Sequence, residues 1–291
     1  MSTLTLNLSG VLIRLLEEIS ARQAQLIGAD PSQAYLNYYL DVASHLQALH
    51  PVGTGLGIGA GMSVLEVGSG IGTRCLLGTG IFGARFTGLE PCLNSYSTLG
   101  RVIEEMKVAN PHFDYRYVNR GGEDTGLPSE SFDVILSFEV MEHVKAPDQV
   151  ILEMYRLLKP GGKLFISTCN YDSFYEGHYR SLWLPFLNDT LKRAYIGLRG
   201  YNREFLKELN FLTKRELLGY LAGAGFAEVT AGLRFASTPP PQLLVNFPRD
   251  YAPEPVRPRK SIASRWVQNR SVHAFLARFD REYKIYIEAR K

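Results

Sequence analysis

The residues with the clearest chemical potential are an acid and three glycines in the segment Val64-Leu65-Glu66-Val67-Gly68-Ser69-Gly70-Ile71-Gly72-Thr73. The apolar residues before Gly68 predict a buried strand, and the glycines predict a turn that opens a helix. Glycine lets a backbone approach a ligand closely, and the N–H groups at a helix N-terminus favour an anion. The dinucleotide pattern G-x-G-x-x-G is not met, because the third glycine comes one residue early and Thr73 takes its place. Glu66 suits a cationic ligand group better than a pyrophosphate.

Further acids stand where the next predicted strands end. The short apolar stretch Phe86-Thr87-Gly88-Leu89 leads into Glu90 and Pro91. A carboxylate at this point can accept hydrogen bonds from both hydroxyls of a ribose. Glu123 and Asp124 precede Leu127-Pro128, and Glu139 follows the apolar stretch 132–138. The position of Glu90 predicts a ribose-containing ligand at the carboxyl end of the second strand.

The order of these segments resembles the class I S-adenosylmethionine (SAM) methyltransferases, in the methyltransferase 11 branch with the ubiquinone and sterol enzymes. The glycine turn has the form E-x-G-x-G-x-G, and Ser137-Phe138-Glu139-Val140-Met141-Glu142-His143-Val144 is similar to that branch's EVLEHV segment. Leu157-Leu158-Lys159-Pro160-Gly161-Gly162-Lys163 is similar to the family's helix end and Pro-Gly-Gly turn. The resemblance covers roughly residues 35 to 168.

The resemblance implies SAM as the cofactor and gives its contacts a place in this chain. Glu66 would receive the methionyl ammonium, and Glu90 would hold the ribose. Glu123 would meet the adenine amino group, with Asp124 as a near rival. The remaining residues expected to line the cofactor site are Gly68, Ser69, Gly70, Gly72, Thr73, Pro91 and Glu139.

Methyl transfer to a hydroxyl also needs a group that accepts a proton. His143 is expected to begin the helix after the fourth strand, and an imidazole can accept a proton near neutral pH. His178 is the second candidate and Glu139 a third. A packing or capping role for His143 and a surface position for His178 stay open.

The alternation of strands and helices predicts a Rossmann-like α/β fold with a parallel sheet. The expected strands cover 63–67, 85–89, 114–118, 132–138, 163–168 and 227–235, and 283–291 is the antiparallel seventh strand that the resemblance implies. Expected helices cover 9–27, a stretch from Asp30-Pro31 through Leu46, 213–224 and 262–279. The glycine run Gly53–Gly61 predicts a flexible approach to the first strand.

The chain is expected to form one domain, residues 1–291, with three additions to the sheet. Residues 1–61 form an N-terminal helical cap, 170–211 a lid, and 236–280 a second insertion. The lid leaves from the carboxyl end of a strand, where open α/β sheets bind ligands. Acceptor contacts are therefore expected from its Tyr175, Tyr179, Arg180 and Trp183, together with Tyr38. The alternative is a lid that buries its aromatic side chains against the N-terminal helices.

Composition narrows the class of protein. Hydrophobic residues make up 45% of the 291 and the net charge is +3, which does not indicate a nucleic-acid partner. The three scattered cysteines and the lack of a secretory signal or long apolar run favour a reduced, cytoplasmic setting. No carboxylate set for a metal is evident. A basic cluster near the C-terminus consists of Arg257, Arg259, Lys260, Arg265 and Arg270. It is expected to be a solvated face, or else to contact an anionic lipid surface or a phosphorylated acceptor. The oligomeric state stays open, and a dimer is possible.

The sequence therefore predicts a SAM-dependent methyltransferase acting on a small molecule or a carrier-linked glycan, as in natural-product or glycan biosynthesis. Histidine-assisted O-methylation is preferred to C- or N-methylation. Two alternatives stay open: methylation of a quinone-like or prenylated lipid, and SAM binding without methyl transfer.

Overall fold

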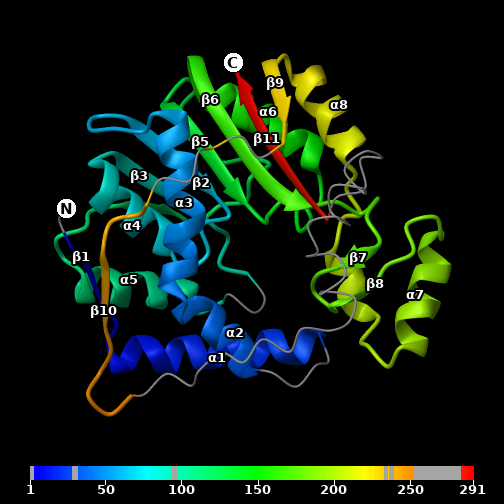
Figure 1. The fold of residues 1–291 in the computed structure, drawn as a ribbon, viewed down its shortest axis with the longest axis horizontal. Coiled ribbons are helices and arrows are strands. Elements are labelled where there is room, and N and C mark those ends of the chain that lie inside the picture. The colour runs from blue at the N-terminus through cyan, green and yellow to red at the C-terminus, as the bar shows by residue number, and fades with distance from the viewer. Residues whose placement is uncertain (1–2, 28–31, 94–96, 233–234, 236–238, 252–282) are drawn as a thin grey trace.

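A seven-stranded sheet forms the centre of the computed structural model, with strand order β4-β3-β2-β5-β6-β11-β9 (Figure 1). Its strands are β2 (Ser63–Val67), β3 (Arg85–Leu89), β4 (Arg116–Val118), β5 (Phe132–Phe138), β6 (Leu158–Cys169), β9 (Ala227–Ala231) and β11 (Lys284–Arg290). The structure describes residues 3–27, 32–93, 97–232, 235, 239–251 and 283–291. The expected helix 262–279, the helix start at Asp30-Pro31 and the basic cluster lie outside the described residues.

The pairing of the strands confirms the predicted fold class. β2 pairs in parallel with β3 and β5, and β5 pairs in parallel with β6. β11 enters between β6 and β9 and runs antiparallel to both. Six parallel strands and one antiparallel strand result, as predicted. β6 is longer than predicted because it includes the Pro-Gly-Gly segment, where the Gly161 N–H donates to Lys291 O (3.0 Å).

Alternate side chains of the central strands enter two different cores. Val64, Val134 and Leu136 belong to one buried cluster, whereas Leu65 and Ile135 belong to the other. The first face packs against α1 (Gly10–Ile27), α2 (Ser32–Leu40), α3 (Val42–Leu56), α4 (Thr73–Phe82) and α5 (Leu99–Ala109). The second packs against α6 (Pro147–Leu157) and α8 (Lys214–Ala224). Because both faces are covered, the strands read as continuous apolar runs.

The N-terminal cap differs from its prediction in two places. The single helix expected up to Leu46 is interrupted at Asp41, whose carboxylate accepts the N–H of Ser44 (3.1 Å) and begins α3. The flexible reading of the glycine run is wrong for its first half, because α3 continues to Leu56. Gly53 and Gly55 let this helix approach the rings of Phe82 and Phe235, where a β-carbon would collide.

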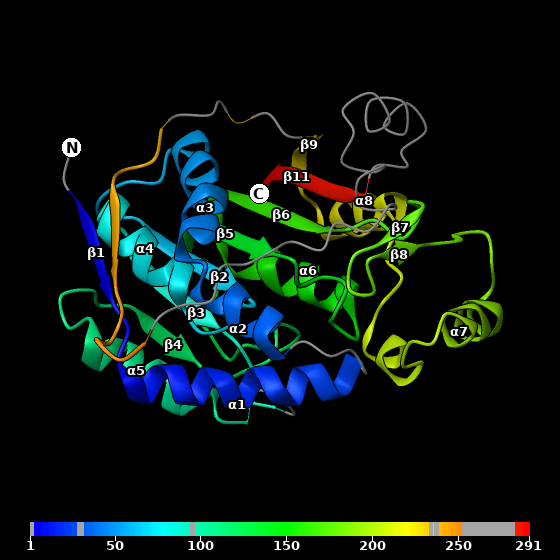
Figure 2. The same cartoon turned by 60° about the horizontal axis from the view of Figure 1, so that its bottom comes forward.

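A small parallel sheet joins the N-terminus to the second insertion. β1 (Leu4–Asn7) pairs with β10 (Leu243–Asn246), and the two strands lie side by side in Figures 1 and 2. The Asn7 N–H donates to Asn110 Oδ1 (2.7 Å), which ties this sheet to the end of α5. The sequence did not predict either strand.

The segment predicted as a lid contains its own aromatic core. Its elements are β7 (Tyr175–Glu176), β8 (Ser181–Leu182), α7 (Asp189–Leu198) and the 3-10 helix η2 (Glu204–Glu208). The buried members of this core are Cys169, Tyr171, Tyr179, Trp183, Ile196, Phe205, Leu206 and Leu209. The aromatic side chains thus pack mainly on one another; η2 contacts α1. Among the described helices, none combines the length and apolar character needed to cross a membrane.

Candidate active site

The glycine turn between β2 and α4 is held against the neighbouring strand. The Gly68 and Ser69 N–H groups both donate to Leu89 O, at 2.8 and 3.1 Å. Gly72 has a left-handed φ of 82°, and a β-carbon there would meet the hydroxyl of Tyr115. Only glycine fits this position without strain. Thr73 then begins α4, which lacks a side-chain cap, so the turn presents helix N–H groups as predicted.

Glu66 is buried in β2 and already has partners. Arg74 Nη1 donates to its Oε1 (3.1 Å), and Cys75 Sγ donates to its Oε2 (3.2 Å). Burial raises the pKa of Glu66, and the guanidinium offsets part of that effect. The predicted receptor of an ammonium group is therefore one half of a buried ion pair.

Glu90 lies beside the same turn. Its Oε2 accepts the Gly70 N–H (3.0 Å), and Tyr117 donates its hydroxyl proton to Glu90 O (2.7 Å). Burial raises the pKa of Glu90 to about 7. Pro91 follows Glu90 and is partly buried. The carboxylate thus lies at the junction of β3 and the glycine turn, where the sequence places the ribose.

The two candidates for the adenine contact have different surroundings. Glu123 is half-buried, whereas Asp124 is exposed. The pKa of the Arg156 guanidinium is raised, mainly by its hydrogen bond to Glu153 and less by the charge of Asp124. The next residue, Thr125, is fixed by Glu153, which accepts its N–H (3.1 Å) and its hydroxyl (2.6 Å). This arrangement favours Glu123.

Buried hydroxyl groups without a partner surround the turn. Among the described residues, the hydroxyls of Ser69, Thr73 and Ser137 are buried and make no hydrogen bond. Leaving such a group unpaired costs about 1–3 kcal/mol. A polar ligand such as SAM, with its hydroxyls, ammonium and carboxylate, would satisfy them, so the residues present fit the expected cofactor.

Glu139 closes the site at the end of β5. It has a left-handed φ of 56°, and its carboxylate accepts the Ser167 hydroxyl (2.8 Å) and pairs with Lys284 (3.0 Å). Burial alone would lower the pKa of Lys284, but Glu139 raises it above its usual value. This ion pair makes Glu139 a weaker candidate for a base than either histidine.

His143 and His178 meet across the site. The prediction that His143 begins a helix is wrong: it lies in the turn 141–143, and α6 starts at Pro147. The His143 N–H donates to Val140 O (2.8 Å), which closes this turn. Its Nε2 lies 3.3 Å from Nε2 of His178, which the lid brings from the other side.

The two imidazoles differ in their surroundings. Burial lowers the pKa of His143 to about 4, although the ring still reaches solvent. His178 Nδ1 lies 2.7 Å from Oε1 of Glu176, whose side chain is fully buried. Burial alone would lower the pKa of His178, but Glu176 raises it. The surroundings therefore shift the pKa values of the two rings in opposite directions.

The aromatic residues expected to bind an acceptor take structural positions in the lid. Trp183 is fully buried and donates its indole N–H to Tyr171 O (3.2 Å). Tyr179 is buried and donates its hydroxyl to Asn202 O (2.6 Å), and the Tyr175 ring packs edge-on against Tyr283. Arg180 is exposed with a left-handed φ of 50°. Tyr38 lies apart from them, on α2 beside Arg74.

Some residues near the histidines form sets with metal-ligand character. Among the described residues, Glu142, His143 and His178 each offer one ligand atom, and these atoms lie within 4.8 Å of one another. Glu139, Glu142 and Cys169 form a second such set. Glu142 is buried and accepts the Thr168 hydroxyl (2.7 Å), and its carbonyl accepts the Asn210 N–H (2.7 Å).

Sequence reasoning missed Arg74, Glu176 and Lys284. Arg74 carried a signal, because a cation in the first turn of a helix opposes the helix dipole and needs a partner. Glu176 stands two residues before His178, which was a weaker signal. Lys284 had none, because only the antiparallel insertion of β11 brings it to Glu139.

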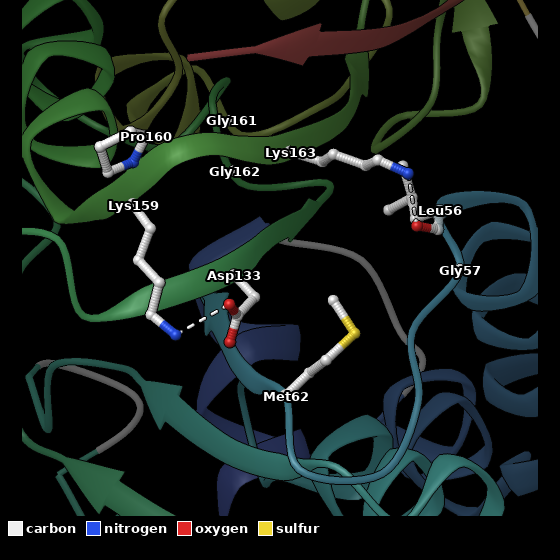
Figure 3. A pocket seen from close by; sticks show the side chains of 9 residues that line it. All are labelled: Leu56, Gly57, Met62, Asp133, Lys159, Pro160, Gly161, Gly162 and Lys163. Atoms are coloured by element: carbon white, nitrogen blue, oxygen red, sulfur yellow. Dashed lines mark hydrogen bonds and ion pairs between the residues drawn. The ribbon is translucent and has the colours of Figure 1, made fainter.

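A cavity of about 290 Å³ lies at the amino ends of β5 and β6, away from these residues (Figure 3). Lys159 pairs with Asp133 across it (2.8 Å), and Lys163 donates to Leu56 O (2.8 Å). Its charged groups are paired within the protein, whereas the Ser69 and Thr73 hydroxyls at the glycine turn make no hydrogen bond among the described residues.

Comparisons with known proteins agree with this geometry. A family model described as a methyltransferase domain matches residues 54–231. A probable SAM-dependent methyltransferase of Mycolicibacterium smegmatis is 31% identical over 172 residues, which cover 59% of this chain and 60% of that protein. A ubiquinone biosynthesis O-methyltransferase of Dechloromonas aromatica is 36% identical over 111 residues, which cover 38% of this chain and 46% of that protein. The chain thus spans about half the length of these relatives.

A solved structure shares the fold. A candidate sarcosine dimethylglycine methyltransferase from Galdieria sulphuraria superposes with a TM-score of 0.51 at 14% identity, covering 84% of each chain. The family match extends over more than half of the chain and includes β2, the glycine turn, Glu90 and the histidine-bearing turn. The chain therefore belongs to the methyltransferase-domain family.

Proposed function

We propose that this enzyme methylates a hydroxyl of a small-molecule or carrier-linked glycan acceptor, with His143 and His178 removing the proton. The observation that carries the proposal is the 3.3 Å contact between the Nε2 atoms of the two rings. SAM supplies a methyl group on a positively charged sulfur, so the chain needs no nucleophile of its own. Its residues must align the acceptor and take its proton.

The hydrogen bonds of His143 and His178 indicate which ring nitrogens could accept the proton of the acceptor hydroxyl. His178 Nδ1 is engaged by Glu176, and the His143 ring also hydrogen-bonds to the backbone of Glu208. The Nε2 atoms are therefore the nitrogens available to an acceptor hydroxyl that enters between the rings. His143 is neutral at physiological pH, and Glu176 stabilises a positive charge on His178. A proton taken at this point can be held by the pair.

The cofactor would lie along the glycine turn, with Glu90 at the ribose and Glu123 at the adenine edge. Glu123 is preferred to Asp124 because Glu123 is half-buried, whereas Asp124 is exposed. The unpaired hydroxyls of Ser69 and Thr73 support this placement. The other residues proposed to line the cofactor-binding site are Glu66, Gly68, Gly70, Gly72, Pro91 and Glu139.

Support for a carrier-linked acceptor comes from a second cavity of about 520 Å³ in the lid, next to Asn210. Three cations line it, Lys192, Arg193 and Lys207, against two acids, Asp189 and Glu216. Lys192 pairs with Asp189 (3.5 Å) and Lys207 with Glu204, so a phosphate would compete with these acids. Asn210 also donates its N–H to Glu142 O (2.7 Å), so the cavity adjoins the histidine-bearing turn. A phosphate of a carrier would find cations there.

A quinone-like acceptor is the alternative, because several relatives are ubiquinone biosynthesis O-methyltransferases. Labelled SAM and a panel of acceptors separate the two. Diphosphate-linked glycans should accept the label if the lid cavity binds a carrier. Preference for detergent-solubilised prenylated phenols would assign the quinone-like alternative instead.

The base is tested by alanine variants with a matched histidine control. His143→Ala should lower turnover by about 100-fold or more, in line with general-base catalysis, while S-adenosylhomocysteine binding stays unchanged. His112→Ala, at an exposed histidine after α5, should leave turnover unchanged. Full activity in His143→Ala would move the role to His178. Full activity in both single variants and in the double variant would overturn histidine assistance.

A divalent cation is a second candidate for activating the hydroxyl, because Glu142, His143 and His178 offer ligand atoms within 4.8 Å of one another. A metal could lower the pKa of a bound hydroxyl. Dialysis against a chelator separates the two mechanisms. Activity that is lost and then restored by Mg²⁺, Mn²⁺ or Zn²⁺ would assign the metal; activity that persists would leave the histidine pair.

A further inference from the structure

The side chain of Arg74 is buried at the N-terminus of α4 with part of its guanidinium unpaired. Only 11% of the side chain is exposed. Nη1 donates to Glu66 (3.1 Å), and the guanidinium lies 4.6 Å from the centre of the Phe138 ring and hydrogen-bonds to the Tyr38 hydroxyl. Its Nε is buried and has no hydrogen-bond partner among the described residues. An unpaired buried N–H of a charged group is costly, which points to a ligand that satisfies it.

The surroundings of Arg74 favour a carboxylate as that ligand. The guanidinium stands at the start of a ten-residue helix without a side-chain cap, where N–H groups and the helix dipole attract an anion. His45 is uncharged at neutral pH, because burial lowers its pKa to about 3. It therefore does not compete with Arg74 for a carboxylate. A guanidinium can hold a carboxylate through two parallel hydrogen bonds.

The ion pair of Glu66 and Arg74 also matches an amino-acid zwitterion. Glu66 offers a negative group to an ammonium, and Arg74 offers a positive group to a carboxylate, 3.1 Å apart. Both side chains adjoin the glycine turn, which bears the unpaired Ser69 and Thr73 hydroxyls. The free amino acid end of SAM carries both charges.

We propose that Arg74 binds the carboxylate of the methionyl group of SAM, so that Glu66 and Arg74 together recognise its amino-acid end. The proposal rests on the cofactor placement given above and adds a residue that determines ligand specificity. Tyr38, which the sequence predicted to contact the acceptor, is instead proposed to position Arg74. Its hydroxyl hydrogen-bonds to the guanidinium and holds it in place.

The test is a cycle of two ligands and two proteins, measured by calorimetry. The ligands are S-adenosylhomocysteine and its decarboxylated analogue, which differ only in the carboxylate. The wild-type chain should bind the analogue at least tenfold more weakly. In Arg74→Met this difference should fall to twofold or less, because S-adenosylhomocysteine loses affinity and the analogue does not.

A purely structural role of Arg74 gives a different result. Arg74→Met would then weaken both ligands equally, or neither, and the proposal would be overturned. If that variant does not fold, Tyr38→Phe, at a half-exposed tyrosine, should reduce the difference between the ligands at least twofold; an unchanged difference would contradict the proposal. A wild-type chain that binds neither ligand would instead refute the cofactor placement on which the proposal rests.

Discussion

The amino and carboxyl ends of the central strands hold their polar groups in different ways. At the amino ends, Asp133 accepts from Lys159 and from the Ser63 N–H, both at 2.8 Å, and Lys163 donates to the end of α3 (Figure 3). At the carboxyl ends, the buried hydroxyls of Ser69, Thr73 and Ser137 and the Nε of Arg74 make no hydrogen bond within the part of the chain that the structure describes.

This difference separates groups that are paired within the fold from groups that a bound ligand could pair. Polar groups paired within the protein add to stability, whereas unpaired buried groups cost free energy and are kept where a ligand binds. A cavity alone is a poor guide, since the one of about 290 Å³ lies at the amino ends, where the charges are satisfied. Three predictions test this contrast.

The largest effect is expected when the same change, a carboxylate to an amide, is made at each end. Glu66→Gln leaves the buried guanidinium of Arg74 without its counter-charge, which should cost about 3–5 kcal/mol of unfolding free energy. Asp133→Asn alters a solvent-exposed pair, since 40% of the Lys159 side chain is exposed, and should cost about 1 kcal/mol or less. Urea denaturation measures both. Equal losses would show that the buried ion pair at the carboxyl ends and the exposed one at the amino ends contribute alike to stability.

Two glycines give a second comparison. Gly72→Ala should cost about 1–2 kcal/mol for a left-handed backbone and about 1–3 kcal/mol for overpacking against Tyr115. Gly161→Ala, in the Pro-Gly-Gly segment, has a similar φ of 73° and no atom within 4 Å of its β-carbon, so only the backbone cost should appear.

Ligand binding adds a further readout to the glycine pair. Gly72→Ala should also weaken S-adenosylhomocysteine binding, whereas Gly161→Ala should leave it unchanged, because only the first glycine adjoins the cofactor seat. Loss of affinity in Gly161→Ala would show that the two ends of the strands are coupled.

The sequence predicted the sheet well because each strand carries its own apolar pattern. β2, β3 and β5 have the predicted bounds, and the acids Glu66, Glu90 and Glu139 lie at or just after their carboxyl ends. β1 and β10 could not be predicted in this way, because each is short and is stabilised by a partner more than two hundred residues away. The glycine run misled for a related reason: Gly53 and Gly55 serve close packing against Phe82 and Phe235, and that contact is not encoded locally.

The candidate site was predictable for residues in motifs and not for their partners. Glu66 and Glu90 follow from the turn and the strand end, whereas Arg74, Glu176 and Lys284 depend on tertiary placement. The lid shows the limit most clearly. Its aromatic residues suggested an acceptor pocket, but Trp183 and Tyr179 are buried with their polar atoms paired.

The smallest effect concerns the pH dependence of cofactor binding through Glu90. Burial raises the pKa of this carboxyl group to about 7, and only the ionised form can accept hydrogen bonds from both ribose hydroxyls. A group with this pKa is about one-tenth ionised at pH 6 and about nine-tenths at pH 8, so the Kd of S-adenosylhomocysteine should fall by about tenfold over that interval.

Glu90→Gln isolates this contribution from other titrating groups, including those of the ligand. The variant should bind more weakly at pH 8 and should lose most of the dependence on pH, because an amide does not titrate. Asp124→Asn, at an exposed acid, is the matched control and should keep the wild-type slope. A Glu90→Gln variant with the full slope would show that another group titrates and that Glu90, which accepts the Gly70 N–H, does not control the pH dependence of binding.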